Sequence, residues 1–407
     1  MDKKLLLIIG AGIEQIKAYQ LAKKMGLLVA GTDINSNAPG FKFADYKIKA
    51  STRDISETVK AVKKFHQSVH QNNGIMTLAN DVPLTVASIA KELGLPGISI
   101  RSARLASDKI LMKDKFKKDG ILIPPYKQIF NSKDLFKAAK AWRYPLVIKP
   151  ADSRGARGVL RITKKVDHEW AFNYSLNESA SGKVLVEKFI GGLQISAESF
   201  VYKGVCHTVA WSERNYEFMD KFAPYIIENG GILPANLNKS QLSAIKITMQ
   251  KCADSMNIKN GSIKGDLVMT SEGPVVIEVA ARLSGGFFCT DQIPKAVGVD
   301  LVKQTIKISL GMKIDVSELE PKNLCALGIR YFFPKPGKIT KIEGFDQLKR
   351  YDWVFKKLLF KKVGEIIEPY TDHTKRVGLV ITVGKNREEA NRRAVMAVNS
   401  VTIETSQ

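Results

Sequence analysis

Cysteine and histidine are scarce in this sequence, which limits the chemistry that its side chains can perform. The 407-residue chain has four cysteines and five histidines. The cysteines are far apart and lack the close pairs that a zinc site or a redox motif requires. We therefore predict free, buried thiols in a reducing cytosol at Cys206, Cys252, Cys289 and Cys325.

Long apolar runs are also missing. The first run, Leu5–Ile9, ends at Gly10, which is too early for the apolar core of a secretory signal. No segment reaches the roughly 20 apolar residues that a membrane helix needs. We therefore expect a cytoplasmic protein with no membrane partner. The apolar fraction of 44% is ample for the two or three packed domains that a chain of this length requires.

Acidic residues are too few to balance the basic ones. The chain has 40 Asp and Glu against 63 Lys and Arg, a formal charge of +23. Such a charge suits nucleic acid, an anionic surface or an acidic small substrate. The lysines are spread over the whole length, so we interpret them as a solvated surface that also attracts small anions. A nucleic-acid-binding protein would need a concentrated basic face with interleaved aromatic residues.

Strand-like and helix-like patterns alternate along the first hundred residues. Apolar runs that end at glycine or aspartate are typical of strands buried in a parallel sheet. Apolar residues at near-helical spacing follow the first of these runs. The alternation predicts a small doubly wound α/β domain. The expected strands are 5–9, 27–33 and 75–79, and the expected helices are 13–22 and 83–93.

Beyond residue 107 the strict alternation is replaced by mixed helices and strands, which predicts an α+β organisation. We expect a middle domain followed, after residue 322, by a small C-terminal α+β unit. The expected helices are 132–142, 241–256 and 387–401, and the expected strands are 146–149, 184–190, 195–202, 265–269, 275–279, 326–333 and 377–383.

The run Gly10-Ala11-Gly12 after the first strand, with Asp33 closing the next strand, suggests a dinucleotide site. The third glycine of that motif is missing, because Gln15 stands in its place. A hydride-transfer enzyme is therefore a minor alternative. The simpler interpretation is that these glycines turn a strand into a helix.

Two lysines and a glycine-bearing loop in the middle domain favour phosphate binding. Lys109 opens a predicted helix, and Lys149 closes a buried strand directly before a proline. Burying an unpaired charge is costly, so Lys149 needs a counter-charge, which a bound phosphate would supply. The loop 152–159 follows at once, and its exposed N–H groups could fold over a polyphosphate. Considered alone, such a lysine is usually a solvated surface residue, and such a loop is usually a hairpin turn.

A predicted strand at 184–190 breaks into Gly191 and Gly192, where we expect a hinge. Backbone groups that such a break frees can pair with the edge of a purine. This segment therefore predicts a place for a nucleotide base beside the phosphate-binding residues.

Two carboxylates are expected to face each other on a hairpin. The strands 265–269 and 275–279 are joined by a turn at 271–274, and their register can bring Asp266 beside Glu278. Facing carboxylates repel unless a cation lies between them, and magnesium accepts such oxygens together with nucleotide phosphates. Arg282 follows the second strand and could stabilise a migrating phosphoryl group. The alternative is that Arg282 only fixes its turn through a carboxylate partner.

In their order and spacing these motifs resemble the ATP-grasp superfamily, in particular the carboxylate–amine ligases that include biotin carboxylase, glycinamide ribonucleotide synthetase and the L-amino acid ligases. The runs 281–287 and 330–337 look most like the amino-acid-ligase branch. The resemblance covers most of the chain and implies an ATP-grasp fold. It places a pre-ATP-grasp α/β domain at 1–106, an ATP-grasp domain at 107–322 with a mobile subdomain at about 115–190, and the C-terminal α+β domain at 323–407.

The resemblance also implies ATP and Mg²⁺, or Mn²⁺ in its place, and assigns a role to each motif. Arg282 would contact the phosphoryl group or acyl phosphate. The separation of the two metal ligands, 278 − 266 = 12, is the usual one in the family. The implied metal ligands are Asp266 and Glu278, and the implied nucleotide-binding residues are Lys109, Lys149, Ser153, Gly155, Gly158, Glu187, Lys188, Phe189, Ile190, Gln194 and Val268.

Three positions depart from the family pattern. Ala280 stands where an asparagine often completes a second metal site, Gln194 stands where a glutamate often binds ribose, and Asp266 replaces the commoner glutamate. The implied reaction phosphorylates a small carboxylate and joins it to an amine, at least one of them an amino acid, and needs no protein nucleophile. Homodimers are common in the family. A carboxylase or an enzyme like carbamoyl-phosphate synthase is the alternative within the superfamily.

Overall fold

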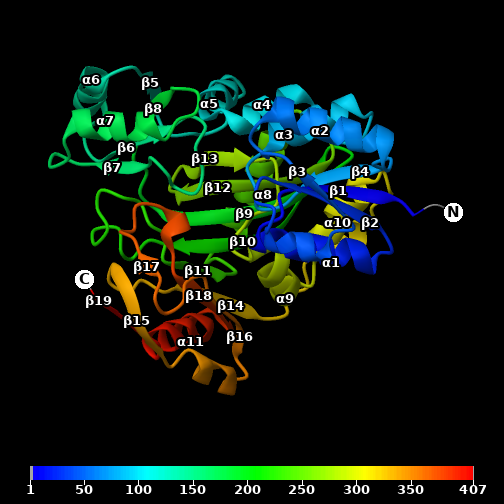
Figure 1. The fold of residues 1–407 in the computed structure, drawn as a ribbon. Helices are drawn as coiled ribbons and strands as arrows, with labels where there is room; N and C mark the ends of the chain where they lie inside the picture. Colours follow the sequence, from blue (N-terminus) through cyan, green and yellow to red (C-terminus); the bar gives the residue numbers. More distant parts are fainter. Residues whose placement is uncertain (1–2, 407) are drawn as a thin grey trace.

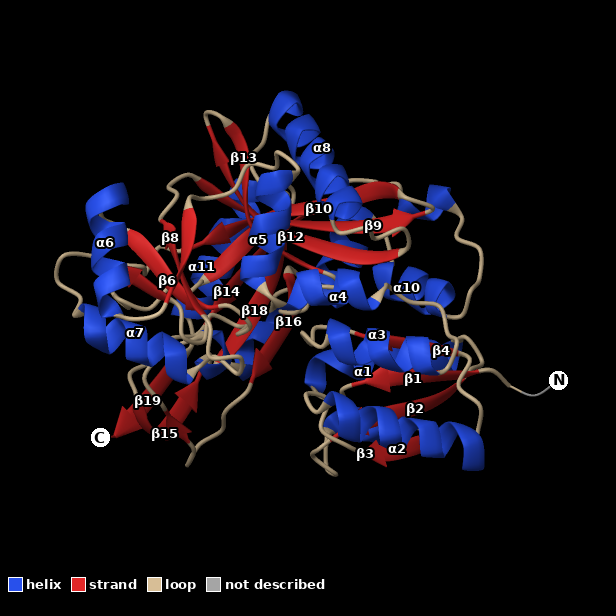
Figure 2. Cartoon of the chain, turned by 90° about the horizontal axis from the view of Figure 1, so that it is seen from above, coloured by secondary structure: helices blue, strands red, loops and turns tan. Residues whose placement is uncertain are grey.

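A parallel sheet with the strand order β3-β2-β1-β4 forms the N-terminal region of the chain, of which the computed structural model describes residues 3–406. The central strand β1 (Leu5–Ile9) is fully buried, because helices cover both faces of the sheet. Figure 2 shows this layered arrangement beside the rest of the molecule. The predicted doubly wound α/β region is confirmed. Its other elements are α1 (Ile16–Lys24), β2 (Leu28–Asp33), β3 (Tyr46–Lys49), α2 (Ile55–Ser68), β4 (Gly74–Thr77) and α3 (Pro83–Glu92).

The turn after β1 is filled by the chain's own backbone. The N–H of Gly40 donates to the carbonyl of Ala11 at 2.7 Å, and a Cβ on Gly40 would lie 2.8 Å from that oxygen. The N–H of Ala11 in turn donates to the Asp33 carboxylate at 3.0 Å. These contacts occupy the groups that a dinucleotide would use, which favours the simple strand-to-helix turn.

A smaller antiparallel sheet, with the order β5-β8-β6-β7, follows helices α4 (Ile100–Ser107) and α5 (Lys109–Lys118). Helices α6 and α7 cover one of its faces, and Figure 1 shows this unit as a separate lobe. It coincides with the region predicted to be a mobile subdomain. Its elements are β5 (Tyr126–Ile129), α6 (Ser132–Trp142), β6 (Leu146–Pro150), β7 (Leu160–Ile162), α7 (His168–Asn177) and β8 (Val184–Lys188).

An eight-stranded sheet, with the order β13-β12-β9-β10-β11-β14-β18-β16, forms the centre of the molecule. The predicted hairpin is confirmed, because β12 and β13 pair and Asp266 lies opposite Glu278. The elements of this part are β9 (Leu193–Tyr202), β10 (Val205–Asn215), β11 (Gly230–Leu233), α8 (Lys239–Ser255), β12 (Gly261–Thr270), β13 (Gly273–Ala280), α9 (Ile293–Val297) and α10 (Leu301–Ser309).

The C-terminal segment continues this same sheet. Strand β14 pairs with β11, so the sheet runs across the predicted boundary after residue 322. A separate small sheet, β17-β15-β19, and helix α11 lie at the far end (Figure 1). The elements are β14 (Ala326–Tyr331), β15 (Gly337–Glu343), β16 (Val354–Leu359), β17 (Ile366–Ile367), β18 (Gly378–Gly384), α11 (Arg387–Asn399) and β19 (Thr402–Ser406).

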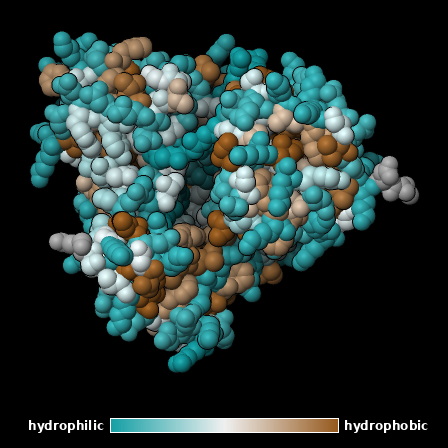
Figure 3. All heavy atoms as spheres, viewed as in Figure 1, coloured by the Kyte–Doolittle hydropathy of each residue, from teal (hydrophilic) through white to brown (hydrophobic). Residues whose placement is uncertain are grey.

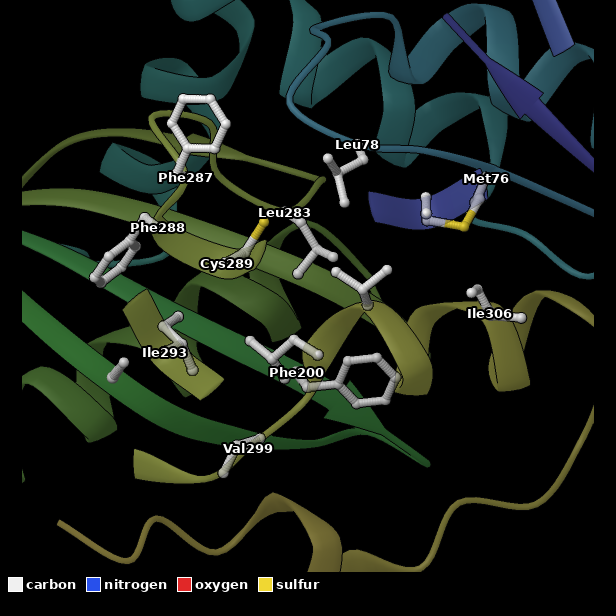
Figure 4. Close-up of a cluster of buried hydrophobic side chains, with 14 of the residues drawn as sticks. Met76, Leu78, Phe200, Leu283, Phe287, Phe288, Cys289, Ile293, Val299 and Ile306 are labelled. Atoms are coloured by element: carbon white, nitrogen blue, oxygen red, sulfur yellow. The ribbon is translucent and has the colours of Figure 1, made fainter. Parts of the chain in front are cut away.

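The largest apolar core joins the three regions. Figure 4 shows Leu283 and Cys289 in the centre of this core, with Met76 of the N-terminal sheet on one side and Phe200 of β9 below them. The segment that follows β13 is therefore fixed from both sides. Cys252 and Cys289 are buried as expected, whereas Cys206 and Cys325 are half-buried, and all four thiols are free. Among residues 3–406, no helix combines the length and apolarity needed to cross a membrane.

Candidate active site

Two connected chambers lie where the three regions meet, with volumes of about 680 and 550 Å³. The space-filling view shows the hydrophilic hollow between the lobes (Figure 3). Every residue singled out in the sequence lines the first chamber except Gly158. A Cβ on Gly158 would lie 2.6 Å from the Pro150 ring, so this glycine lets the loop pack against β6. The residues that line both chambers are Arg53, Asp81, Arg154, Gly155, Arg157, Arg214, Lys264, Arg282 and His373.

Lys109 links the start of α5 to the glycine-bearing loop. Asp108 caps this helix by accepting hydrogen bonds from two backbone N–H groups, which places Lys109 at the first helical position. The Lys109 ammonium donates to the Ser153 carbonyl at 2.6 Å and lies 3.6 Å from the Glu278 carboxylate. Lys109 therefore stands between the predicted phosphate loop and the predicted metal ligands.

Lys149 finds its counter-charge within the protein, which corrects the prediction that a bound phosphate would supply it. Its ammonium and that of Lys113 each lie 2.9 Å from Oε1 of Glu187, and all three side chains are buried. Burial lowers the pKa of Lys113 to about 8. Although burial opposes ionisation, the two ammoniums hold the pKa of the Glu187 carboxyl below its usual value. Two cations share one anion, so this triad keeps a positive charge facing the chamber.

The sequence reasoning missed Lys113, although a signal was available. Lys113 lies one helical turn after Lys109, so the two lysines share one face of α5. Lys113 reaches Glu187 of the small sheet, whereas Lys109 reaches Ser153 and Glu278. The carboxylate of Glu187, in contrast, belongs to a residue for which only backbone contacts were expected. Its side chain points into the triad instead.

The predicted base-binding segment keeps one free backbone donor. The N–H of Lys188 donates to the Pro125 carbonyl at 2.9 Å, and that of Phe189 donates to the Pro145 carbonyl at 3.3 Å. Within the described part of the chain, the N–H of Ile190 has no backbone partner. Val268, which is buried, and Gln194 pair across β12 and β9 beside this segment. Of the backbone N–H groups of residues 188–190, that of Ile190 therefore remains for the predicted contact with a purine edge.

The opposed carboxylates are surrounded by cations. Oδ2 of Asp266 lies 2.5 Å from the Lys264 ammonium, and Oδ1 lies 3.1 Å from Nη1 of Arg214. Although burial opposes ionisation, the charges of Lys109 and other nearby cations hold the pKa of Glu278 far below its usual value. The Glu278 carboxyl is therefore available as an anionic ligand.

These carboxylates fit a magnesium ion that shares its coordination with nucleotide phosphates. Oδ1 of Asp266 is buried and, among residues 3–406, accepts no hydrogen bond, although Nη1 of Arg214 lies 3.1 Å away; a cation would therefore share this oxygen with Arg214. Ala280 offers no side-chain oxygen at the neighbouring position. Residues 3–406 contain no group of three or more carboxylate, histidine or cysteine side chains placed to hold a metal alone. The donor set consequently requires phosphate oxygens or water to complete a six-coordinate site.

Arg282 has the carboxylate partner that the simpler interpretation of this residue requires. Its guanidinium makes a bidentate contact with Asp81 of the N-terminal region, with Nη2 and Oδ2 2.9 Å apart and Nε on the other oxygen. Nη1 donates to the Leu283 carbonyl at 3.0 Å. The sequence did not reveal Asp81, because 201 residues separate it from Arg282.

The second chamber contains a further cluster that sequence reasoning did not find. The Arg214 guanidinium contacts Oε2 of Glu228 at 2.5 and 2.8 Å, and the Arg376 guanidinium lies 3.8 Å from the centre of the Tyr331 ring. Although burial opposes ionisation, the two arginines lower the pKa of Glu228 to about 2. The apolar residues that line this chamber include Phe287, Phe288, Ile329, Phe360 and Leu379.

The glycine-bearing loop rests against the C-terminal segment. The backbone N–H of His373 donates to the Gly155 carbonyl at 3.0 Å, and the His373 ring accepts from the Glu228 N–H at 3.3 Å. Burial and then the Arg376 charge hold the pKa of His373 well below its usual value, so the ring is neutral. The loop that separates the chambers is thus closed in this structure.

Comparisons with known proteins agree with this fold and site. A profile of the ATP-grasp domain matches residues 106–286. The chain therefore has an ATP-grasp fold. A second profile, the L-amino acid ligase C-terminal domain 2, matches residues 330–406. The chain therefore carries an ATP-grasp domain followed by the C-terminal domain that is described for L-amino acid ligases.

Several proteins are similar over nearly the whole chain. The crystal structure of the L-amino acid ligase from Bacillus licheniformis superposes with a TM-score of 0.84, 20% identity and complete coverage of both chains. The biotin carboxylase structure from Campylobacter jejuni gives a TM-score of 0.73 and 19% identity over 99% of this chain and 92% of that one. The phosphoribosylamine–glycine ligase of Methanococcus maripaludis is 24% identical over 97% of this chain and 93% of its own length.

Proposed function

We propose that the protein is an ATP- and magnesium-dependent ligase that joins a carboxylate to an amine through an acyl phosphate, with an amino acid as at least one substrate. One observation carries this proposal. Asp266 and Glu278 face each other in the first chamber, whose lining also includes Lys109, Lys149 and Arg282. One chamber is suited to a nucleotide, and the other offers room for the two remaining reactants.

The proposed reaction has two steps that balance in atoms and electrons. A carboxylate oxygen of the first substrate attacks the γ-phosphorus of ATP, and the bond to the β–γ bridging oxygen breaks, which releases ADP. The amine nitrogen of the second substrate then attacks the acyl carbon of the mixed anhydride. The carbon–oxygen bond to phosphate breaks, and the amine loses a proton, so the products are an amide, inorganic phosphate and H⁺.

The protein contributes positioning and charge neutralisation, which is what phosphoryl transfer chiefly requires. Lys109 and Lys149 bind phosphate oxygens, the loop that contains Ser153 and Gly155 covers them, and Arg282 stabilises charge on the migrating group. Asp266 and Glu278 would hold magnesium, which would neutralise phosphate charge. Glu187 to Ile190, Gln194 and Val268 surround the nucleoside.

The purified protein with Mg²⁺ and ATP tests the proposal against a panel of amino acids, other small carboxylic acids and amines. We expect ADP and phosphate to form only with a matching pair, and mass spectrometry to show one amide per ADP. Hydroxylamine in place of the amine should trap the acyl phosphate as a hydroxamate. ADP formation that needs only bicarbonate would favour a carboxylase or a carbamoyl-phosphate-synthase-like enzyme, and no turnover with any pair would refute the ligase.

We further propose that the enzyme is cytoplasmic, acts on small molecules rather than nucleic acid, and forms a homodimer. We also propose that the chain divides into domains at residues 106 and 322. Mg²⁺ with ATP should raise the melting temperature, whereas a generic oligonucleotide should leave it unchanged, because only a ligand of the native state stabilises it. Sedimentation equilibrium measures the oligomeric state, and a monomer across the concentration range would refute the dimer.

A further inference from the structure

Asp81 joins the N-terminal region to both chambers. It follows β4, and its carboxylate holds the Arg282 guanidinium at two points. The backbone carbonyl of the same residue accepts a hydrogen bond from Nη1 of Arg154, which belongs to the glycine-bearing loop. One residue thus contacts the arginine that we assign to phosphoryl transfer and the loop that we assign to ATP phosphates.

The surroundings of Asp81 are unusually rich in arginine. Arg53, Arg154, Arg157 and Arg282 line the junction between the chambers together with this one carboxylate. Burial lowers the pKa of Arg154, the Asp81 carboxylate opposes that shift, and the three other arginines add to it. Without Asp81 the four guanidiniums would repel one another across the junction.

The contacts of Arg282 leave it free to act on a substrate. A guanidinium has five N–H groups, and Asp81 and the Leu283 carbonyl engage three of them. Two N–H groups, one on each terminal nitrogen, are left for oxygens of an anion in the chamber. The Asp81 carboxylate therefore fixes the orientation of the Arg282 guanidinium and leaves two of its N–H groups available to a substrate.

We propose that Asp81 is a positioning residue for phosphoryl transfer, which holds the Arg282 fork toward the migrating phosphoryl group and secures the closed loop through Arg154. This inference rests on the proposed ligase function. It makes the N-terminal region, which also supplies Arg53 and residues 81–85 to the lining of the first chamber, part of the machinery for the chemical step. A simple interdomain ion pair would stabilise the fold without affecting turnover per folded molecule.

The substitution Asp81→Asn tests this inference, because it removes the charge and keeps the shape. We expect kcat to fall about 10- to 100-fold, the range typical of residues that orient a catalytic group. KM for ATP and the stabilisation by Mg²⁺-ATP should stay within about threefold of wild type, since the nucleotide contacts are untouched. Asp81→Glu keeps the charge and should retain more turnover than Asp81→Asn.

A double-mutant cycle with Arg282→Lys supplies the readout that a structural role would not give. If Asp81 acts through Arg282, the double variant should turn over within about threefold of Arg282→Lys alone. Asp45→Asn is the matched control, because Asp45 pairs with Lys23 in the same region and lines neither chamber. It should change stability and leave kcat unchanged.

The outcomes separate this inference from the proposed function. Normal kcat per folded molecule in Asp81→Asn, or losses that multiply in the double variant, would overturn the inference while leaving the ligase intact. Absence of ADP formation by the wild type with every substrate pair would refute the ligase first and the inference with it. If Asp81→Asn does not fold, the double-mutant cycle with Arg282→Lys is measured with Asp81→Glu instead.

Discussion

The two chambers differ in where their charged side chains come from. In the first chamber, Lys113, Lys149 and Glu187 all belong to the ATP-grasp domain and form a buried triad that is complete within it. At the junction that both chambers share, the Arg282 guanidinium depends on a carboxylate from the N-terminal region, and in the second chamber Arg376 of the C-terminal segment reaches the Glu228 carbonyl. Nucleotide binding should therefore tolerate changes in domain arrangement that the chemical step does not.

The same comparison separates binding from chemistry. The triad keeps its charge wherever the outer regions lie, so it suits a ligand that arrives first, such as a nucleotide. The paired arginines reach their final directions only when all three regions are packed, because each partner is on a different region. Substitutions at the junction should consequently affect kcat, and substitutions in the triad should affect the affinity for ATP.

The largest effect is expected for Glu278→Gln, which removes one ligand charge from the carboxylate pair and preserves its shape. Turnover should fall on the order of 1000-fold with the fold intact, since the charge neutralises phosphate through the metal. Asp266→Asn should act in the same direction, and the two losses should not multiply because both residues share the ion. Circular dichroism together with a magnesium titration of kcat measures both quantities. Near-normal turnover at limiting magnesium would refute the assignment of Asp266 and Glu278 as metal ligands.

Arg282→Lys should have the next largest effect, on the order of a 100-fold loss in kcat. Lysine keeps the charge but cannot reproduce the planar fork that holds two oxygens. Binding of Mg²⁺-ATP should stay nearly normal, because the lost contacts strengthen mainly in the transition state. Melting temperature and turnover are to be measured on one preparation. A destabilised variant with unchanged turnover per folded molecule would refute the role of Arg282 in phosphoryl transfer. Arg282 would then have only a structural role, through its ion pair with Asp81.

Lys149→Met tests the triad and should weaken ATP binding about tenfold, which corresponds to one lost phosphate contact. The buried Glu187 would keep Lys113 as its sole cation, so stability without nucleotide should also fall by about 2 kcal/mol. Calorimetry of ATP binding and a denaturant titration measure the two losses. The denaturant titration tests the ion pair with Glu187. If Lys149 were paired only with bound phosphate, the stability of the variant without nucleotide would be unchanged or higher. Lys127→Met, at an exposed position of β5 that lines neither chamber, is the control.

Local patterns made much of the fold and the first chamber predictable. Leu5–Ile9 is apolar throughout because both faces of β1 are covered, and the register of β12 and β13 follows from a short turn. Lys109 and Lys149 were recognisable because each ends or begins an element. Such signals depend on neighbours in sequence, so they can be read without the tertiary structure.

The remaining features depend on contacts between distant segments. Asp81 and Arg282 are 201 residues apart, and no periodicity links them. Glu187 was expected to act through its backbone, because its strand pattern does not reveal which buried lysines face it. The pairing of β14 with β11, which continues the large sheet, could not be predicted either, because pairing between strands that are far apart in the sequence produces no local sequence pattern.

The smallest effect is expected at Glu198, a carboxylate beneath the turn that follows Arg282. Its Oε1 accepts the Ser284 N–H at 3.0 Å, while Oε2 is buried and without a hydrogen-bond partner among the described residues. Burial raises the pKa of Glu198 to about 7, in contrast to the paired Glu228, whose pKa is lowered to about 2. Glu198 is therefore protonated in the folded state at pH 6, whereas the unfolded chain is not. Its contribution to stability is fully present below the unfolded pKa and is lost as pH rises through about 7.

The stability of the wild type should therefore fall by about 1 kcal/mol between pH 6 and pH 8 relative to Glu198→Gln, because the folded protein releases a proton that the unfolded chain has already lost. Glutamine keeps the carbonyl acceptor for Ser284 and cannot ionise, so the variant should equal or exceed the wild type at pH 8. Denaturant titrations of both proteins at the two pH values measure the difference. Parallel pH dependence in the two proteins would mean that Glu198 is ionised in the folded state throughout. The turn would then carry a fixed charge, as the arginine-paired carboxylates of the second chamber do.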